Sequence, residues 1–531
     1  MLQSRLTTLV LVLFLGILMP LSFAPFNIAF IAPLALAGLL FIARNRSPKR
    51  AFKLGLLFGF GMFSWGIWWI RISLIEFGGA PVAVGVFLTL LLALYLALYY
   101  AILSYAMVRV SWRFSWKALL LLPALGMLLE FVRAQLFTGF PWLALGYSLT
   151  DNPLSGYLFP TMGALMASFW VYFGAGIVLL LLQKISEFKR VKTGASDQVA
   201  LKETVREMLL PAFLSLGVMG GSVGLTTLLL TDEIKPVDAP LKVALLQGNI
   251  AQELKFSQEQ YYSILMTYLN LTDSVAGKVD LVIWPETAVP SLYDQEIQLG
   301  EHLRALSQES GTIVMTGIFS GNGATVRNSI VTYSDTFKSR DQRYDKAHLV
   351  PFGEFIPFRS VLNLFEGVIE IPFSDITKGS AGQAPFVLRS GQNGAPVQAS
   401  ASICYEAVFG DELRYQGENA HFLVNVSNDA WFGDSIGPWQ HFQIARARAI
   451  ELQREMVRST NNGITALINA SGQVEAMLPQ FEEGILEVMV TPVEGVTAYV
   501  RLGDAFWALL AGLILLCAGI WHRWSVKRCA R

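Results

Sequence analysis

The sequence predicts a polytopic α-helical membrane domain of about eight spans, joined to an α/β domain that lies outside the membrane. Of its 531 residues, 53% are hydrophobic and only 15% are charged, a balance too apolar for a soluble chain of this length. Apolar runs of bilayer length fill residues 1–230 and return near the end. Residues 231–503 instead show short β-rich runs that alternate with polar helical ones.

Eight apolar runs could each cross a bilayer, which takes about 20 residues. They lie at residues 6–20, 24–43, 54–75, 81–108, 118–133, 161–183, 208–230 and 504–522. Pro20, Pro25 and Pro33 interrupt the first two runs, but losing both as a pair would leave the topology unchanged. The first run follows Arg5 as a signal peptide would, yet no small-residue cleavage site precedes Pro20, so we expect a retained span.

Basic residues predict the orientation, because Lys and Arg accumulate in the cytoplasmic loops of membrane proteins. They cluster at residues 44–53, 109–117, 184–192 and 523–528. With eight spans and a cytoplasmic amino terminus, all these clusters fall on the cytoplasmic side. The predicted domains are therefore a membrane domain with seven spans at 1–230, an extracytoplasmic α/β domain at 231–503, and a final span with a basic tail at 504–531.

Charged residues near the span ends are expected to extend to the membrane–water interface, and on the outer side they could also contact a lipid headgroup. They are Arg71, Glu76, Glu130 and Arg133.

Charge and composition exclude several classes of protein. Lys plus Arg and Asp plus Glu both number 40, so the chain has no excess of positive charge that would indicate a nucleic-acid partner. Of the three cysteines, Cys517 and Cys529 lie in or just beyond the final apolar run, so no disulfide framework is expected around Cys404. The five histidines show no metal-ligand spacing and no nucleotide signature occurs, so we expect neither metal nor cofactor.

Three segments of the α/β region place a reactive side chain directly after a strand-like run, where α/β domains usually expose catalytic groups. The predicted strands lie at 241–247, 280–284, 312–318, 329–333 and 421–426. Glu286 follows a strand and a proline, so burial is expected to raise its pKa toward neutrality, as suits a general base. The Cys404 thiol needs such a base to become a nucleophile. Lys346 could lower the thiol pKa and stabilise an oxyanion.

Each of these residues has a simpler interpretation when taken singly. A lone buried Cys usually fills a core, and a Glu or Lys at a strand end is usually a solvated cap. As an ordered Glu, Lys and Cys set, however, the three segments resemble the nitrilase or carbon-nitrogen hydrolase superfamily. Two longer stretches, 344–355 and 425–433, resemble the bacterial apolipoprotein N-acyltransferases, and matches at 137–147 and 458–463 extend that resemblance over essentially the whole chain.

The resemblance implies eight spans and a four-layered nitrilase-like α-β-β-α sandwich in the periplasm. It implies that Glu286 is the base, Lys346 the oxyanion stabiliser and Cys404 the nucleophile.

The same resemblance implies four auxiliary residues. Glu354 would help position Lys346 or the acceptor, while Tyr405 and Glu406 would shape the pocket beside the nucleophile. Trp431 has two interpretations, as core packing or as an amphipathic wall and hinge where acyl chains enter.

An amidase of this fold needs no membrane, so the spans indicate a lipid substrate. The resemblance implies transfer of an acyl chain from a phospholipid, through a thioester on Cys404, to the amino terminus of the S-diacylglyceryl-cysteine of an apolipoprotein. We expect ping-pong kinetics, no cofactor, and a location in the bacterial inner membrane. One alternative is a membrane-tethered carbon-nitrogen hydrolase that uses water as acceptor. Another is a non-catalytic binding module, in which Cys404 would be dispensable.

Overall fold

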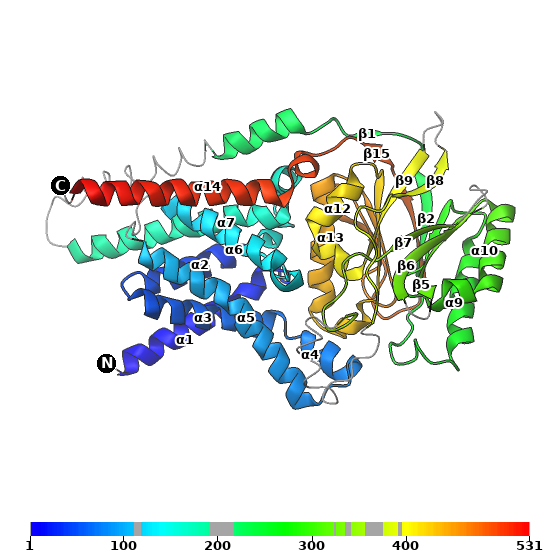
Figure 1. The fold of residues 1–531 in the computed structure, drawn as a ribbon, viewed down its shortest axis with the longest axis horizontal. Helices are drawn as coiled ribbons and strands as arrows, with labels where there is room; N and C mark the ends of the chain where they lie inside the picture. Colours follow the sequence, from blue (N-terminus) through cyan, green and yellow to red (C-terminus); the bar gives the residue numbers. More distant parts are fainter. Residues whose placement is uncertain are drawn as a thin grey trace. The chain divides into compact units, whose positions relative to one another are not determined.

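The structure is a computed structural model that describes residues 2–110, 118–191, 217, 219–322, 325–334, 341–355, 375–390 and 396–529 (Figure 1). The chain divides into two compact units. The helical unit comprises Met1–Trp68, Val86–Leu230 and Arg501–Arg531, and the sandwich unit comprises Trp69–Gly85 and Thr231–Val500. The short segment Trp69–Gly85 thus belongs with the sandwich unit, although the sequence predicts that a span runs to residue 75.

Long apolar helices build the helical unit. They are α1 (Leu2–Leu18), α2 (Ile31–Ala43), α3 (Pro48–Gly66), α5 (Val82–Arg109), α6 (Ala118–Gln135), α7 (Ser155–Val191) and α14 (Ala498–Cys529). Within the described residues, five helices are long and apolar enough to cross a membrane, and six if α3 and the helical segment bent 60° from it are one span. The shorter helices Ile31–Ala43 and Met219–Leu230 are apolar as well. The count of about eight spans therefore stays a prediction, and part of the run at 208–230 lies outside the described residues.

Glu130 and Arg133 do not extend to an interface, so that prediction is wrong for these two residues. Their exposed fractions are 4% and 3%. The chain after α6 folds back and supplies partners, so that Arg133 Nη1 donates to the Trp142 carbonyl over 2.6 Å. The Glu130 carboxylate accepts hydrogen bonds from the Leu145 backbone, the Ser168 hydroxyl and the Tyr172 hydroxyl.

Two sheets form the centre of the sandwich unit. The first has the order β14-β2-β3-β5-β6-β7, with β4 paired to β5, and the second has the order β13-β12-β11-β10-β9-β8. The first contains β2 (Leu241–Gln247), β3 (Leu281–Ile283), β4 (Val289–Leu292), β5 (Ile313–Asn322), β6 (Thr325–Tyr333), β7 (Gln342–Asp345) and β14 (Gly484–Val490). The second contains β8 (Phe386–Ser390), β9 (Pro396–Ile403), β10 (Phe422–Ser427), β11 (Met456–Thr460), β12 (Ala466–Ile468) and β13 (Val474–Met477). A two-stranded ribbon joins β1 (Lys235–Pro236) to β15 (Val493–Glu494). The five predicted strands are all present.

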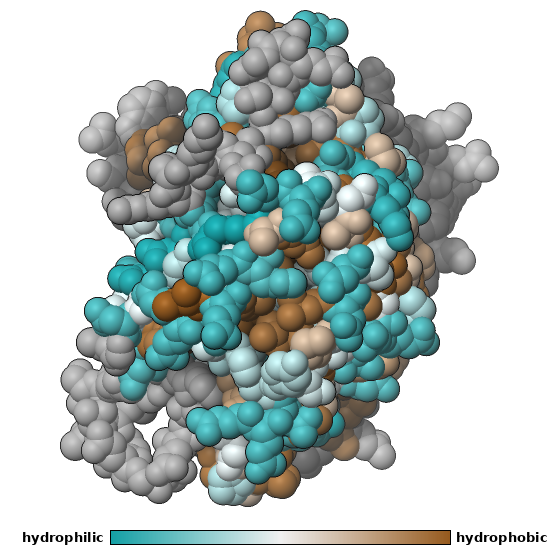
Figure 2. All heavy atoms as spheres, turned by 90° about the vertical axis from the view of Figure 1, so that its right-hand side faces the viewer, coloured by the Kyte–Doolittle hydropathy of each residue, from teal (hydrophilic) through white to brown (hydrophobic). Residues whose placement is uncertain are grey.

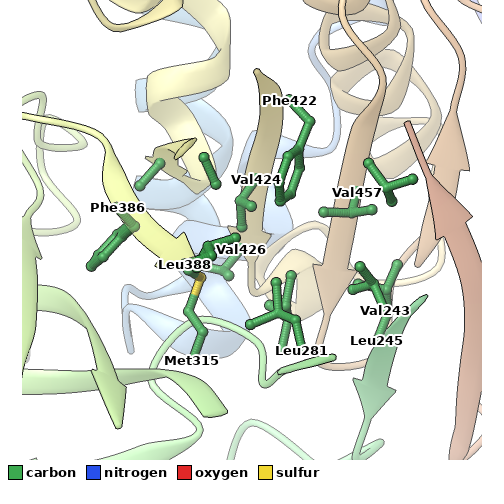
Figure 3. Close-up of a cluster of buried hydrophobic side chains, with 14 of the residues drawn as sticks. Val243, Leu245, Leu281, Met315, Phe386, Leu388, Phe422, Val424, Val426 and Val457 are labelled. Carbon is green, nitrogen blue, oxygen red and sulfur yellow. The ribbon is translucent and has the colours of Figure 1, made fainter. Parts of the chain in front are cut away.

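Both faces of the central strands are buried, which explains their nearly continuous apolar sequences. Along β2, Val243 faces the core between the two sheets, whereas its neighbour Ala244 faces the helices. Figure 3 shows this inter-sheet core, where Val243 and Leu281 come from the first sheet and Val424 and Val457 from the second.

Helices cover the outer face of each sheet. Helices α9 (Tyr261–Val275) and α10 (Ile297–Ser310) pack on the first sheet, and α12 (Gly410–Gly417) and α13 (Gly437–Leu452) pack on the second. The predicted α-β-β-α layering is therefore confirmed. Figure 2 shows hydrophilic residues over much of the face toward the viewer, with hydrophobic residues between them.

Strand direction brings Glu286 and Lys346 to the same edge of the first sheet, and Cys404 follows the carboxyl end of a strand in the second sheet. Strands β2, β3 and β5 run parallel, as do β9, β10 and β11. Because β6 is antiparallel to both β5 and β7, β7 runs in the same direction as β5. The carboxyl ends of β3, β7 and β9 precede Glu286, Lys346 and Cys404 respectively, and such ends are where α/β folds place their sites.

Candidate active site

Glu286 lies in a turn that follows β3 and packs closely against β5. A glycine on β5 makes this approach possible, since a Cβ on Gly317 would lie 2.5 Å from the Thr287 nitrogen and 2.8 Å from the Glu286 Cα. No side chain fits there without moving the turn. Gly317 therefore sets the position of the Glu286 backbone.

Three donors hold the Glu286 carboxylate. Asn328 Nδ2 donates to Oε1 over 2.8 Å, and Lys346 Nζ lies 3.3 Å from the same oxygen. The backbone N–H of Asn428, which follows β10, donates to Oε2 over 2.8 Å. The carboxylate is thus fixed from both sheets and keeps lone pairs that can accept a proton.

The pKa of Glu286 is lowered, so the predicted shift toward neutrality is wrong. Burial does raise the pKa of this carboxyl, but the positive charges of Lys346 and Lys255 and the hydrogen bonds from Asn328 and Lys346 outweigh it. The sequence indicated the burial but not how many donors surround the group. Glu286 is therefore a carboxylate at rest.

Lys346 occupies a buried position between two carboxylates. Its Nζ lies 2.9 Å from Glu354 Oε1 and 3.3 Å from Glu286 Oε1, and only 1% of its side chain is exposed. Burial lowers the pKa of this ammonium, but Glu354, Glu286 and Cys404 raise it more, and the net shift is upward. Lys346 is therefore a fixed cation.

Cys404 begins a 3₁₀ turn, Cys404–Val408, directly after β9. Its φ of 51° is a left-handed conformation that a residue with a Cβ rarely adopts, and such strain is often found at reactive residues. Burial and the Glu286 charge raise the pKa of the thiol to about 12, although Lys346 acts in the opposite direction, as the sequence predicts. At neutral pH the residue is a thiol.

Glu406 ties the Cys404 turn to the chain after β7. Its Oε2 accepts the Ile403 N–H over 2.7 Å, and its Oε1 accepts the Ala347 N–H over 2.6 Å and the His348 N–H over 3.1 Å. The Tyr344 hydroxyl donates to Oε1 over 2.9 Å. Burial raises the pKa of Glu406 to about 7 despite these donors.

Tyr405 and Trp431 contribute aromatic surface. Tyr405 is buried, with its ring centroid 5.2 Å from that of Phe409 in an edge-on contact. Trp431 is half-buried within the sandwich unit, where its ring meets Phe77 at 5.6 Å and its carbonyl accepts the Ser73 hydroxyl over 2.7 Å.

Lys255, Asn328 and Asn428 surround Glu286, and the sequence-based predictions name none of them. Lys255 Nζ donates to the Glu286 carbonyl over 2.9 Å, and burial lowers its pKa to about 8. Asn328 also donates to Glu354 Oε1 over 3.1 Å. Asn428 could have been predicted as a site residue, because it lies in the stretch 425–433 that carries the family resemblance. Lys255 sits in a loop with no comparable pattern.

Among the described residues, no group of three or more His, Cys, Asp and Glu could hold a metal ion. A carboxylate, a fixed ammonium and a thiol are buried in this site, and these three groups are suited to acyl transfer through a thioester.

The fold is that of the carbon-nitrogen hydrolase class, and the carbon-nitrogen hydrolase family model matches residues 242–497. A second family model, the apolipoprotein N-acyltransferase N-terminal domain, matches residues 15–177. The chain belongs to the apolipoprotein N-acyltransferase family.

Full-length relatives establish this membership. An apolipoprotein N-acyltransferase from Pasteurella multocida is 36% identical over 525 residues, covering 97% of this chain and 96% of the relative. One from Methylococcus capsulatus is 37% identical over 509 residues, covering 95% of this chain and 93% of the relative. Among solved structures, an amidase from Nesterenkonia sp. AN1 is 16% identical, with a TM-score of 0.35, and covers 52% of this chain and 96% of its own.

Proposed function

We propose that this protein transfers an acyl chain from a phospholipid to the N-terminal amine of the S-diacylglyceryl-cysteine of apolipoproteins, through a thioester on Cys404. Glu286 is the general base and Lys346 stabilises the oxyanion. The observation that carries the proposal is the buried Lys346 ammonium, held between the Glu286 and Glu354 carboxylates at the strand edge where Cys404 also lies.

The first half-reaction begins from a carboxylate and a neutral thiol. A thiol with a pKa of about 12 does not ionise at neutral pH, so its proton moves to Glu286 as sulfur attacks the ester carbonyl carbon. Lys346 balances the negative charge that develops on the carbonyl oxygen. The intermediate collapses to a thioester, the ester C–O bond breaks, and Glu286 returns the proton to the departing lysophospholipid alkoxide.

The second half-reaction uses the same groups. The acceptor amine attacks the thioester carbonyl and passes a proton to Glu286. The C–S bond then breaks, and that proton returns to the sulfur of Cys404. An amide forms, and the enzyme regains its starting protonation state.

Burial favours an amine over water as the acceptor. The exposed fractions of Glu286, Lys346 and Cys404 are 6%, 1% and 9%, so little bulk water reaches the site before substrates bind. A thioester hydrolyses unless water is kept away, and a lipid substrate that covers the site would maintain the exclusion.

The proposed location is the bacterial inner membrane, with residues 231–503 in the periplasm. Apolar helices of membrane length support a membrane location. The basic clusters in the predicted cytoplasmic connectors support the orientation.

Product analysis tests the function. The purified full-length protein is incubated with a phospholipid that carries a labelled acyl chain and with a diacylglyceryl-cysteinyl peptide, and the labelled N-acyl peptide and free fatty acid are separated. We expect N-acyl peptide from the wild type, none from Cys404→Ala, and wild-type amounts from Cys517→Ala, whose thiol is exposed in α14. Free fatty acid without N-acyl peptide would instead establish a hydrolase.

A further inference from the structure

We propose that His441 is a positioning residue that holds the backbone carbonyl of Cys404 and thereby keeps the nucleophile in its left-handed conformation. The inference rests on the proposed role of Cys404 as nucleophile. His441 lies on α13, is fully buried, and places its Nε2 atom 3.1 Å from the Cys404 carbonyl oxygen. A carbonyl oxygen only accepts hydrogen bonds, so Nε2 carries the proton.

The opposite ring nitrogen identifies the tautomer. Nδ1 of His441 lies 3.1 Å from Arg458 Nη2, and a guanidinium only donates, so Nδ1 accepts and the ring is neutral. Asp429 Oδ1 lies 3.2 Å from Nδ1, but its charge is satisfied by Arg458, whose Nη2 lies 2.9 Å from both Asp429 oxygens. Burial and Arg458 lower the pKa of His441, in agreement with a neutral ring.

Cys404 needs such an anchor because its φ of 51° is unfavourable for a residue with a Cβ. Two buried groups hold the backbone on either side of its side chain. Glu406 accepts the N–H of Ile403, and His441 donates to the carbonyl of Cys404. Without the second anchor, the peptide plane after Cys404 is free to rotate, and the thiol would leave its place beside Glu286.

The same cluster is linked to the base. Asp429, which contacts both His441 and Arg458, directly follows Asn428, whose N–H holds Glu286. The segment 425–433 therefore positions the base through Asn428, and it positions the nucleophile through Asp429, which holds Arg458 against His441.

The chain packs closely around Asp429. A Cβ on Gly463 would lie 2.7 Å from the Asp429 Cγ, so a larger residue there would displace the carboxylate. Gly463 and Arg458, both in the stretch 458–463, therefore have a role in placing the Asp429 carboxylate, which the catalytic triad alone does not give them.

Paired amide substitutions test the role, because Gln and Asn share their chemistry and differ in reach. The amide nitrogen of His441→Gln can replace Nε2 and reach the Cys404 carbonyl, whereas that of His441→Asn stops near the position of Nδ1. We expect His441→Asn to lower kcat for acyl transfer about 10- to 100-fold with KM for phospholipid within about twofold of wild type, and His441→Gln to recover most of kcat. His421→Gln is the matched control, since His421 is half-buried in the same unit and accepts the Gln398 N–H.

A readout independent of acyl transfer separates this inference from the proposed function. Iodoacetamide labelling of Cys404 is followed by peptide mass spectrometry in full-length protein, with thermal unfolding as the check on folding. We expect labelling at least about fivefold faster in His441→Asn than in His441→Gln, because a thiol that leaves its buried place beside Glu286 loses the burial and the charge that raise its pKa, and this holds whether or not the wild type transfers acyl chains. Equal labelling rates and equal kcat in the two variants, or a loss confined to KM, would overturn the inference.

Discussion

The carboxylate of Glu354 lies 2.9 Å from the ammonium of Lys346, closer than the 3.3 Å that separates this ammonium from Glu286. Glu354 is in turn fixed by the backbone N–H of Val350, which donates to its Oε2 over 2.8 Å. The two carboxylates therefore have different roles in the proposed mechanism. In the proposed mechanism Glu354 holds the cation in place, which leaves Glu286 able to take up a proton without releasing Lys346.

Glu354→Gln tests this division of work. The change keeps the size of the side chain but removes the charge that holds Lys346, so the ammonium is expected to shift toward Glu286. We expect kcat to fall about 10- to 100-fold, less than the roughly 10²- to 10³-fold typical of removing an oxyanion donor outright. Steady-state kinetics with Lys346→Met alongside provides the comparison, and Glu301→Gln, an exposed change on α10, is the control. A Glu354→Gln enzyme with wild-type kcat would refute the positioning role.

Glu406→Gln should destabilise the sandwich unit. Three backbone N–H groups and a tyrosine hydroxyl donate to this carboxylate, and an amide offers only one acceptor and brings two donors of its own. We expect a loss of about 2–4 kcal/mol in the free energy of unfolding. Tryptophan fluorescence during thermal unfolding in detergent measures it, with Glu412→Gln, half-exposed nearby, as the control. Equal stability of the two variants would contradict the assigned network.

The thiol of Cys404 should label slowly at neutral pH and gain reactivity well above it. Its pKa is raised to about 12, so the reactive thiolate fraction keeps increasing through the range where an ordinary cysteine, with a pKa of about 8.5, has already reached its plateau. The measurement is the iodoacetamide rate at Cys404 from pH 6 to about 10 in a variant without Cys517 and Cys529. A plateau near pH 7 would show that the thiolate is already formed at rest.

Gly317→Ala should displace the base. The added Cβ would lie 2.5 Å from the Thr287 nitrogen, so the turn that carries Glu286 must move. We expect a loss of about 1–3 kcal/mol in stability, as for overpacking elsewhere, together with a fall in kcat. Gly484→Ala on β14 is the matched control, because its Cβ would make only ordinary contacts, at 3.5 Å or more. Full activity in Gly317→Ala would contradict the role given to the close approach.

The fold of the sandwich unit could be predicted from the sequence because its central strands are buried on both faces. Val243 and Ala244 face opposite layers and both are inaccessible, so the apolar run that marks the strand is unbroken. Glu286 follows such an apolar run, whereas Lys346 and Cys404 follow β7 and β9, which contain polar residues, so the set of three is predicted from the family resemblance and not from the strand pattern alone.

Properties that depend on contacts distant in the sequence could not be predicted. The pKa of Glu286 is lowered by Lys255 and Lys346, and no local pattern shows that these residues converge. The sequence predicts Glu130 at an interface, but its side chain is buried. Leu145, in the chain that folds back after α6, and Ser168 and Tyr172, on α7, donate hydrogen bonds to it. The local sequence indicates which side chains are buried, whereas the tertiary fold determines their hydrogen-bond and ion-pair partners.

Trapping the acyl-enzyme tests the central claim most directly. Full-length protein is incubated with phospholipid alone, and Cys404 is examined by intact-protein and peptide mass spectrometry before and after a diacylglyceryl-cysteinyl peptide is added. The account predicts a hydroxylamine-sensitive acyl adduct on Cys404 that the peptide removes as N-acyl product, with far less adduct in Glu286→Gln. An enzyme that forms N-acyl peptide while Cys404 never carries an acyl group would contradict it.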